Sequence, residues 1–180
     1  MSDAADAPAL TSRLSIVPLR AAHAPLLFAH LADPRQYAYV PDAARASVAE
    51  LWQRFADLER GAPPGSGERW LNWVISLRAD GAPLGTLQAT VVPARGRAWI
   101  GYALFTHSWG QGYATEGCAW LAAELAQRHA VRELLASVDT RNAKSIALLE
   151  RLGFERVATA PATLNGKQTT DHRYRLACAP

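Results

Sequence analysis

Short segments in which apolar and polar residues alternate recur along the chain, and this pattern is typical of half-buried β-strands. Residues 14–19 form the first such segment, and the turn Ala79-Asp80-Gly81 separates two longer ones. β-Branched and aromatic residues are frequent in these segments, which also favours strands. The sequence predicts strands over residues 14–19, 70–77, 84–92, 98–105, 134–138, 154–159 and 171–176.

Four other segments carry apolar residues at the spacing of one helix face. Ser47 precedes one of them, and Glu50 follows three residues later, which is the pattern of a capping box. Another ends at Asp33-Pro34, because the residue before proline leaves the helical region. The sequence predicts helices over residues 21–32, 48–60, 114–130 and 143–152.

The order of these elements predicts one α/β domain. Three sequential strands between residues 70 and 105 are joined by short turns and form an antiparallel meander. The strand, helix, strand succession that follows calls for a crossover connection with parallel pairing. We predict a mixed sheet covered by helices, a single domain over residues 13–180 and a flexible N-terminus over residues 1–12.

Composition places the chain among globular proteins, since 49% of its 180 residues are hydrophobic and 19% are charged. The apolar stretches are interrupted well before the ~18 residues of a membrane span. The first residues, MSDAADAPALTSR, lack the basic start and apolar core of a secretory signal, so we expect a cytoplasmic protein. Two cysteines cannot build a disulfide framework or a zinc site, and we expect no metal.

The formal net charge of +3 comes from 17 arginines and two lysines that are dispersed along the chain. Specific nucleic-acid binding needs basic residues gathered on one surface, and no such run is visible. A mildly basic protein suits an anionic small ligand or cofactor instead.

A glycine-rich segment joins the strand over residues 98–105 to the next helix and reads Ser108-Trp109-Gly110-Gln111-Gly112-Tyr113-Ala114-Thr115-Glu116. Glycines allow a tight turn that presents several N–H groups, and the start of a helix adds partial positive charge. This combination can hold a phosphate or pyrophosphate. The segment matches neither the P-loop nor the dinucleotide G-x-G-x-x-G pattern. Taken alone, it is also compatible with a turn that binds no ligand.

A second motif makes the pattern specific. The strand-to-helix junction after residue 138 contains N-x-x-S-x-x-L-L-E-R-L-G-F, from Asn142 to Phe154, one helix and one strand after W-G-Q-G-Y-A-T-E. This pair of motifs is similar to that of the GNAT N-acetyltransferase superfamily. Within it the chain most resembles the Rim-type branch, which includes ribosomal-protein N-terminal alanine acetyltransferases, over residues 14–176.

The resemblance implies a GNAT-like α/β (α+β) fold, with a mixed, mostly antiparallel central sheet of six to seven strands flanked by about four helices. It implies an N-acetyltransferase that moves an acetyl group from acetyl-coenzyme A to a primary amine by direct attack in a ternary complex. The acceptor is either a protein N-terminus or a small molecule, and a homodimer is an expectation because sheet-edge pairing is common in the family.

A non-catalytic acyl-coenzyme A-binding sensor or interaction domain is the alternative function. It is favoured by two departures from the family pattern. Trp99 stands where family members often carry a glutamate, and Leu149 stands where many carry a tyrosine general acid. The two ligand-binding motifs are nevertheless intact, which favours the enzyme.

The resemblance also implies which residues bind the coenzyme. The strand before the glycine-rich segment offers backbone groups to the pantetheine arm, and the N–H groups of the segment hold the pyrophosphate. Asn142 matches an asparagine that hydrogen-bonds the pantetheine region, although an N-cap role suits it equally. The implied residues are Ala103, Leu104, Phe105, Gln111, Gly112, Tyr113, Ala114, Thr115, Asn142 and Ser145.

Catalytic and acceptor residues are less defined. We expect Ser145, or a water that it orients, to protonate the leaving thiolate, and Glu116 or Asp139 to act as the base. In the family the first two helices and the last hairpin build the acceptor site. The implied acceptor residues are Tyr37, Tyr39, Trp70 and Trp73, for which burial in the core is the alternative.

Overall fold

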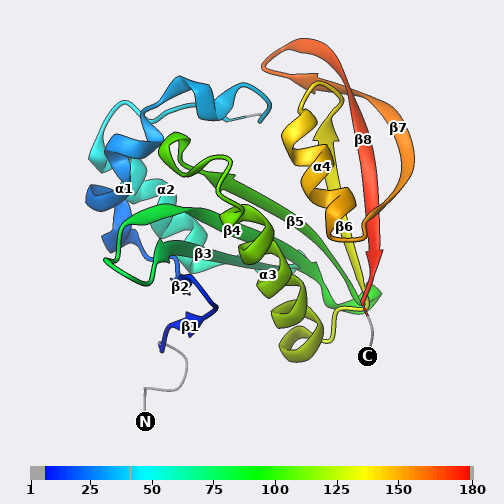
Figure 1. The fold of residues 1–180 in the computed structure, drawn as a ribbon, viewed down its shortest axis with the longest axis horizontal. Coiled ribbons are helices and arrows are strands. Elements are labelled where there is room, and N and C mark those ends of the chain that lie inside the picture. Colours follow the sequence, from blue (N-terminus) through cyan, green and yellow to red (C-terminus); the bar gives the residue numbers. More distant parts are fainter. Residues whose placement is uncertain (1–6, 41, 179–180) are drawn as a thin grey trace.

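The computed structural model of the protein describes residues 7–40 and 42–178. Eight strands form one sheet in the order β1-β2-β3-β4-β5-β6-β8-β7, and four α-helices cover it (Figure 1). The strands are β1 (Ala9–Leu10), β2 (Leu14–Pro18), β3 (Arg69–Leu77), β4 (Pro83–Val92), β5 (Arg97–Leu104), β6 (Glu133–Asp139), β7 (Glu155–Leu164) and β8 (Lys167–Ala177). The helices are α1 (Ala24–Leu31), α2 (Val48–Arg60), α3 (Tyr113–His129) and α4 (Ala143–Arg151), with 3-10 turns η1 (Ala21–His23), η2 (Pro34–Tyr37), η3 (Pro93–Arg95) and η4 (Thr106–Ser108).

The mixed, mostly antiparallel sheet and the four helices confirm the predicted fold class, but the count of six to seven strands was too low. The additional strand is β1, which pairs antiparallel with β2. It lies inside the N-terminal segment predicted to be flexible, where Thr11 also donates a hydrogen bond to Glu116 at 2.6 Å. Two residues are too short a segment for a periodic pattern to reveal. The first six residues of that predicted segment lie outside the described part of the chain.

Side chains of β3 alternate between the two faces of the sheet and so contribute to two hydrophobic cores. Val74 packs with Leu27 of α1 and Phe55 of α2 on one face. Ile75 belongs to the larger core on the other face, together with Leu121 of α3. Figure 1 shows the corresponding layers, with α3 and α4 in front of the sheet and α1 and α2 behind it.

The crossover through α3 joins β5 to β6, and these two strands pair in parallel, as the strand, helix, strand pattern predicts. The second crossover, through α4, does not bring its two strands together. β8 lies between β6 and β7 and pairs antiparallel with both. The hydrophobic pattern identifies strands but does not order them across a sheet, and here the final hairpin inserts its second strand.

The sheet opens between β5 and β6. Their parallel ladder holds only three residue pairs, of which Trp99 with Leu135 is the last. The remaining part of β5 stays paired with β4 as far as Leu104. One edge of β5 is therefore exposed in the middle of the sheet, directly before the glycine-rich segment. Within the described residues, no helix is long and apolar enough to cross a membrane.

Candidate functional site

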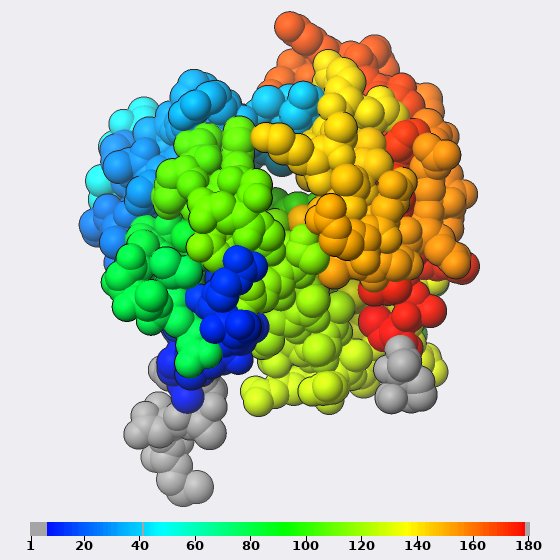
Figure 2. Space-filling view, in the orientation of Figure 1, coloured from blue at the N-terminus to red at the C-terminus, as the bar shows by residue number. Residues whose placement is uncertain are grey.

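A cavity of about 910 Å³ occupies the place where β5 and β6 separate. Figure 2 shows the hollow between the green segment that leads into α3 and the yellow segment that leads into α4, with a blue segment above it. Four stretches of chain line this cavity, which we call the large cavity: residues 35–40, the end of β5 with the glycine-rich segment, the β6–α4 loop and one face of α4. The lining residues are Arg35, Gln36, Ala38, Tyr39, Val40, Tyr102, Ala103, Leu104, Ser108, Trp109, Gly110, Gly112, Tyr113, Ala114, Thr115, Arg141, Asn142, Ala143, Lys144, Ser145, Ala147, Leu148 and Arg151.

The glycine-rich segment lies at one end of the large cavity and adopts the conformation that its sequence predicts. Gly110 and Gly112 have φ angles of 76° and 80°, in the left-handed region that favours glycine. Gly112 is the N-cap of α3, so the first N–H groups of this helix have no partner within it. Gly112, Tyr113, Ala114 and Thr115 all line the cavity, and this helix start can bind an anion.

The end of β5 presents backbone groups to the large cavity, but not all of those expected. The Phe105 N–H donates to the Leu84 carbonyl of β4 at 2.8 Å. The Ala103 carbonyl also faces β4, where a Cβ on Gly85 would collide with it. Backbone groups alternate sides along a strand, so those of Tyr102 and Leu104 face the open edge instead. The predicted roles of Ala103 and Phe105 as backbone partners are therefore wrong, because β4 already occupies those groups.

Two predicted coenzyme residues do not line the large cavity. The Phe105 side chain is buried in the second core and stacks on His30, with ring centroids 4.8 Å apart. Gln111 turns away from the cavity, since its side-chain amide donates to the His107 carbonyl at 3.1 Å. Its own carbonyl accepts a hydrogen bond from Arg13 at 2.9 Å. Gln111 therefore contributes to the conformation of the segment rather than to the cavity wall.

Asn142 and Ser145 form the opposite wall, at the start of α4. The Asn142 side chain accepts a hydrogen bond from the Ser145 N–H at 3.2 Å, which makes Asn142 the N-cap of this helix. Both residues also line the large cavity, so the cap and a ligand contact are compatible. The Tyr102 hydroxyl reaches across from β5 and donates to the Ser145 carbonyl at 3.5 Å.

Tyr102 is a candidate site residue that the sequence reasoning missed. Burial raises its pKa above the ordinary value of 10, although the hydrogen bond to Ser145 opposes this, so the phenol stays protonated at neutral pH. The resemblance to the family implied a tyrosine general acid at position 149 on α4, but this residue is Leu149 and is fully buried. The alternation of side chains along β5 could have indicated that Tyr102 faces α4.

Two buried polar atoms on the wall of the large cavity have no hydrogen-bond partner within the described residues. They are the hydroxyl oxygen of Ser108, a residue that is 2% exposed, and the side-chain oxygen of Gln36. A buried acceptor without a partner costs free energy, and a ligand with N–H or O–H groups removes that cost. Together with the N–H groups at the start of α3, these atoms fit a ligand with a phosphate end and amide groups, as coenzyme A has.

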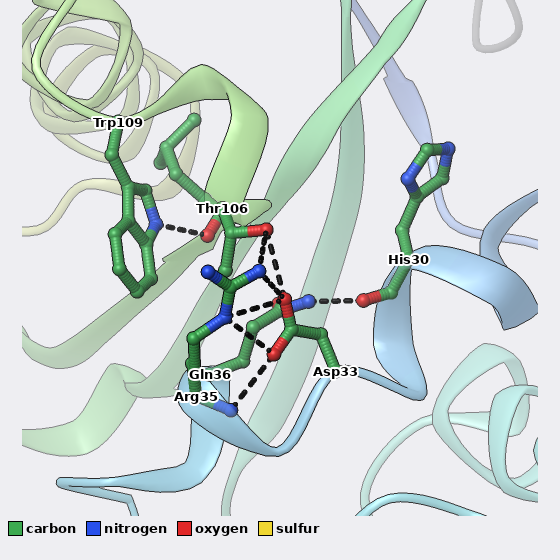
Figure 3. Close-up of polar contacts among 7 residues, drawn as sticks. His30, Asp33, Arg35, Gln36, Thr106 and Trp109 are labelled. Atoms are coloured by element: carbon green, nitrogen blue, oxygen red, sulfur yellow. Dashed lines mark hydrogen bonds and ion pairs between the residues drawn. The ribbon is translucent and has the colours of Figure 1, made fainter.

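The resemblance to the family implies Gln or Arg at the start of the glycine-rich segment, where this chain has Trp109. The structure places other groups around this residue (Figure 3). Its indole N–H donates to the Leu104 carbonyl at 2.7 Å, which fixes the ring at the end of β5. The ammonium of Lys144 lies 4.7 Å from the ring centroid. Lys144 thus supplies a positive charge beside the glycine-rich segment from α4 rather than from the segment itself.

Arg35 approaches the same region from η2 and is fixed by Asp33 (Figure 3). The Asp33 carboxylate accepts from the Arg35 Nη2 at 2.6 Å and from its backbone N–H at 3.0 Å. The Thr106 hydroxyl donates to the same carboxylate at 2.9 Å. These hydrogen bonds, foremost that from the Arg35 side chain, lower the pKa of Asp33. The arrangement holds one guanidinium at the cavity wall.

Glu116, a predicted base, is part of a structural cluster instead. Its carboxylate accepts hydrogen bonds from the Thr11 hydroxyl at 2.6 Å, the Arg13 N–H at 2.7 Å and the Arg13 Nε at 2.7 Å. Burial alone would raise its pKa, but these hydrogen bonds together outweigh burial and lower it. Glu116 does not line the large cavity. The prediction of a base at this position is therefore not supported by its geometry.

Asp139, the other predicted base, is 4% exposed and bound to Arg141. Its two oxygens accept from the Arg141 Nε at 2.8 Å and Nη2 at 2.6 Å, and the Arg141 N–H donates at 2.9 Å. The side-chain hydrogen bond from Arg141 is the main reason why the pKa of Asp139 is lowered. Asp139 is absent from the wall of the large cavity, so it orients Arg141 rather than facing a substrate.

The four aromatic residues predicted for the acceptor site divide into two pairs. Tyr39 lines the large cavity, and Tyr37 lines a smaller one. Trp73 is in the core, 8% exposed and in edge contact with Trp120 at 5.5 Å between ring centroids. Trp70 donates its indole N–H to Glu68 at 2.9 Å and lines neither cavity. The prediction was wrong for both tryptophans, because Trp73 is buried in the core and Trp70 is level with the residues of β5 that are still paired with β6.

The smaller cavity, of about 380 Å³, adjoins the turn of the β7–β8 hairpin. Ala38 and Arg141 belong to the walls of both cavities, so the two spaces meet at these residues. The lining residues are Tyr37, Ala38, Arg141, Leu164, Asn165, Lys167, Gln168 and Thr169. We call this space the hairpin cavity. Within the described residues, no group of three or more His, Cys, Asp or Glu side chains could hold a metal ion.

Comparisons with known proteins agree with this geometry. Residues 13–155 match the family model of the acetyltransferase (GNAT) domain. Among solved structures, Mycobacterium smegmatis RimJ in complex with CoA-disulfide is similar, with a TM-score of 0.80 and 23% identity over 91% of this chain and 81% of that chain. RimL, a ribosomal L7/L12 α-N-protein acetyltransferase in complex with coenzyme A, has a TM-score of 0.79 and 20% identity over 94% and 96% of the two chains.

The ribosomal-protein-S5-alanine acetyltransferase from Vibrio fischeri has a TM-score of 0.79 and 16% identity, over 96% of this chain and 97% of that chain. No curated protein sequence matches the chain. At these identities the structural likenesses establish the fold, whereas the family model matches the sequence itself.

Proposed function

The chain belongs to the acetyltransferase (GNAT) family and is an acetyl-coenzyme A-dependent N-acetyltransferase, and we propose that its acceptor is the N-terminal amine of a peptide or protein. The observation that carries this proposal is the junction of the two cavities at Ala38 and Arg141. The large cavity fits the coenzyme. A second ligand in the hairpin cavity can reach the part of the large cavity that lies beside Ala38 and Arg141. A ternary complex with direct attack needs such an arrangement.

A peptide acceptor is supported by the walls of the hairpin cavity. Asn165 in the turn of the β7–β8 hairpin and Gln168 and Thr169 near the start of β8 offer amide and hydroxyl groups, which suit a peptide backbone. Structures with the same fold include acetyltransferases whose names specify the N-terminus of ribosomal protein L7/L12. The proposal treats residues 13–180 as one acetyltransferase domain, because one sheet runs through this region.

Bound acetyl-coenzyme A would supply a thioester whose carbonyl carbon the amine attacks. The residues of the chain position the two substrates. N–H groups at the start of α3 bind the phosphates, and the backbone groups of Tyr102 together with the Leu104 N–H bind the amides of the pantetheine arm. Asn142 adds a side-chain amide from the opposite wall. Positioning of this kind supplies much of the rate in a reaction between two bound substrates.

Deprotonation of the acceptor does not require a carboxylate in this site. Among the described residues, no Asp or Glu lines either cavity. A peptide α-amine has a pKa of about 7.7–8.0, so roughly a tenth of it is neutral at pH 7. We therefore propose that the amine enters in its neutral form or loses its proton to water.

Protonation of the leaving thiolate falls to Tyr102 or Ser145, two of the hydroxyl-bearing residues on the wall of the large cavity, which are in hydrogen-bond contact with each other. A phenol is a far stronger acid than an aliphatic hydroxyl, so Tyr102 is the better donor. Ser145, the donor expected from the sequence, is then the second candidate, and its carbonyl accepts a hydrogen bond from the Tyr102 hydroxyl at 3.5 Å.

The proposal is tested by measuring thiol release from acetyl-coenzyme A with hexapeptides that begin with Ser or Ala, free amino acids, polyamines and aminoglycosides. We expect saturable turnover with peptides, and none with the same peptides carrying an acetylated N-terminus. Tyr102→Phe should lower kcat by about 100-fold with little change in coenzyme affinity, and Ser145→Ala should lower it less.

Tyr174→Phe is the matched control, because it removes a tyrosine hydroxyl that bonds to Glu150, outside both cavities. It should retain kcat. Turnover confined to polyamines or aminoglycosides would contradict the peptide proposal. Full kcat in Tyr102→Phe would contradict the assignment of the proton donor and leave that role to Ser145.

A further inference from the structure

We propose that the hairpin cavity selects acceptors that carry a carboxylate within a few residues of the reacting amine, and that Arg141 and Lys167 bind this carboxylate. The inference rests on the proposed function, since it names the class of peptide that the enzyme uses. In peptide terms, the preferred N-terminus has Asp or Glu near its start.

The charges at the hairpin cavity are of one sign. Arg141 and Lys167 line it, and no described lining residue is Asp or Glu. The nearby Asp42 carboxylate is paired with Arg45 at 2.7 Å. Potentials of one sign within a concave surface favour ligands of the opposite sign. The cavity therefore favours an anionic group and disfavours cationic acceptors such as polyamines.

Arg141 is held in place for binding. The buried Asp139 carboxylate takes two hydrogen bonds from its guanidinium, through Nε and Nη2, and one from its backbone N–H. The Arg141 side chain is nevertheless 59% exposed, against 3% for Asp139. A guanidinium has five N–H donors, so the edge away from Asp139 remains able to bind a second carboxylate. Fixing the guanidinium in advance reduces the entropy lost on binding.

Lys167 approaches from the other wall. Asn165 and Gly166 have φ angles of 50° and 76°, as in the tight turn that Asn-Gly favours, and Lys167 is the first residue of β8 after this turn. Arg141 belongs to the β6–α4 loop, which bonds to the same hairpin, where the Thr140 N–H donates to the Thr170 carbonyl at 2.9 Å. Two cations on linked but separate segments can bind one carboxylate from two sides.

The location of this pair limits where the carboxylate can be. Arg141 lines the junction with the large cavity, whereas Lys167 lines the hairpin cavity alone. An amine directed into the large cavity therefore leaves the following residues of a peptide in the hairpin cavity. The acidic residue that is recognised lies close to the N-terminus in sequence.

The test compares hexapeptides that begin with Ser and carry Glu, Gln or Lys at position 2, 3 or 4. Glu and Gln are nearly equal in shape, so their ratio of kcat/KM isolates the charge. At one of these positions we expect the wild-type enzyme to prefer Glu over Gln by about fivefold to tenfold at low salt. The ratio should fall as salt rises, because screening weakens an exposed ion pair.

Lys167→Glu is the decisive variant, since it should invert the order so that the Lys peptide is used better than the Glu peptide. Arg173→Gln is the control, because Arg173 lies on the same strand, is exposed and lines neither cavity. It removes one positive charge and should keep the wild-type preference. Arg141→Gln carries less weight in the test, because it leaves Asp139 buried without its partner.

Three results are distinguishable. Turnover of all the peptides with Glu and Gln within twofold of each other overturns this proposal but leaves the proposed function standing. A loss of preference in Arg173→Gln that is about half of that in Lys167→Glu also overturns it, since the change in net charge, one unit against two, would then explain both effects. Absence of turnover on every peptide, together with turnover of a small amine, overturns the proposed function itself.

Discussion

The coenzyme side and the acceptor side of the site are built in different ways. The coenzyme side, residues 102–115 with 142–145, is made mainly of backbone groups at a strand edge and two helix starts. The acceptor side, residues 35–39 and 164–169 with Arg141, is made of side chains from three separate segments. Backbone groups are fixed by local conformation, whereas a side-chain wall depends on how distant segments pack.

This difference determines what an amino-acid substitution alters on each side. A helix start can bind phosphate with many sequences, provided that glycine occupies the positions with positive φ. The acceptor side can change its specificity through single side chains such as Lys167 without disturbing the sheet. Substitutions on the two sides should therefore have different consequences. The largest expected effect is on stability and concerns a residue that was first expected on the acceptor side.

Trp73→Ala should destabilise the protein by about 3–5 kcal/mol, because it leaves a cavity in the core beside Trp120. Tyr39→Ala is the matched comparison, since Tyr39 is 41% exposed and lines the large cavity. It should change the free energy of unfolding by less than about 1 kcal/mol and raise the KM for the acceptor. Urea unfolding and steady-state kinetics measure the two effects.

A stable Trp73→Ala variant with a raised acceptor KM would contradict the assignment of Trp73 to the core. Such a result would place this tryptophan on the acceptor side, and the contrast between the two sides would then be smaller.

Gly112→Ala and Gly166→Ala place the same strain on opposite sides of the site. Their φ angles are 80° and 76°, and an alanine in this region costs about 1–2 kcal/mol. Both variants should lose that much stability. Only Gly112→Ala should weaken coenzyme A binding, by about tenfold, because the strain turns the N–H groups at the start of α3 away from the phosphates. Calorimetric titration with coenzyme A measures this affinity.

Equal coenzyme affinities in the two glycine variants would show that the helix start does not hold the phosphates. A weakened affinity in Gly166→Ala alone would place the coenzyme beside the hairpin and reverse the two sides.

Asn142→Ala and Ser47→Ala each remove an N-cap whose side-chain oxygen accepts a hydrogen bond at 3.2 Å. Each should cost about 1 kcal/mol of stability. Asn142 also lines the large cavity, so only its variant should weaken coenzyme binding. Asn142→Asp separates the two roles, because a carboxylate keeps the cap but loses the amide N–H donors. If Asn142→Asp binds the coenzyme as the wild type does, the cap is the only role of Asn142.

Much of the coenzyme side could be predicted from the sequence, because the signals are local. Gly110 and Gly112 indicate the turn, the apolar spacing after them predicts α3, and Asn142 precedes α4 as an N-cap does. The errors at Ala103 and Phe105 came from the register of β5 with β4, which decides the side of the strand on which each backbone group lies. A shift of the register by one residue moves each backbone group to the other side of the strand, and composition carries no information about the register.

The acceptor side could be predicted only in part, because its residues are far apart in sequence. The resemblance to the family implied Trp70 and Trp73 there, but Trp73 is buried in the core and Trp70 lies near the start of β3, away from the opening. Arg141 and Lys167 carry no local signal of their proximity. Only the insertion of β8 beside β6 brings the hairpin turn to the β6–α4 loop.

The smallest expected effect concerns Glu116, which was predicted as a base and instead anchors the N-terminal segment. Its pKa in the folded protein is below the ordinary value of 4.5. The ionised carboxylate therefore contributes stability above about pH 4.5, and this contribution is lost as the pH falls through the folded pKa. Glu116→Gln should cost about 0.5–1 kcal/mol at pH 7, since its partner Arg13 is 45% exposed.

Urea unfolding of the wild type and Glu116→Gln at pH 7 and pH 3 tests this role. The difference in stability between the two proteins should shrink from pH 7 to pH 3, because protonation of the wild-type carboxylate progressively removes the hydrogen bonds that its ionised form accepts. The kcat of the variant at pH 7 should stay within about twofold of the wild type, whereas removing a general base would cost about 100-fold. A large fall in kcat with unchanged stability would restore Glu116 as the base. The coenzyme side would then hold a catalytic carboxylate as well as backbone groups.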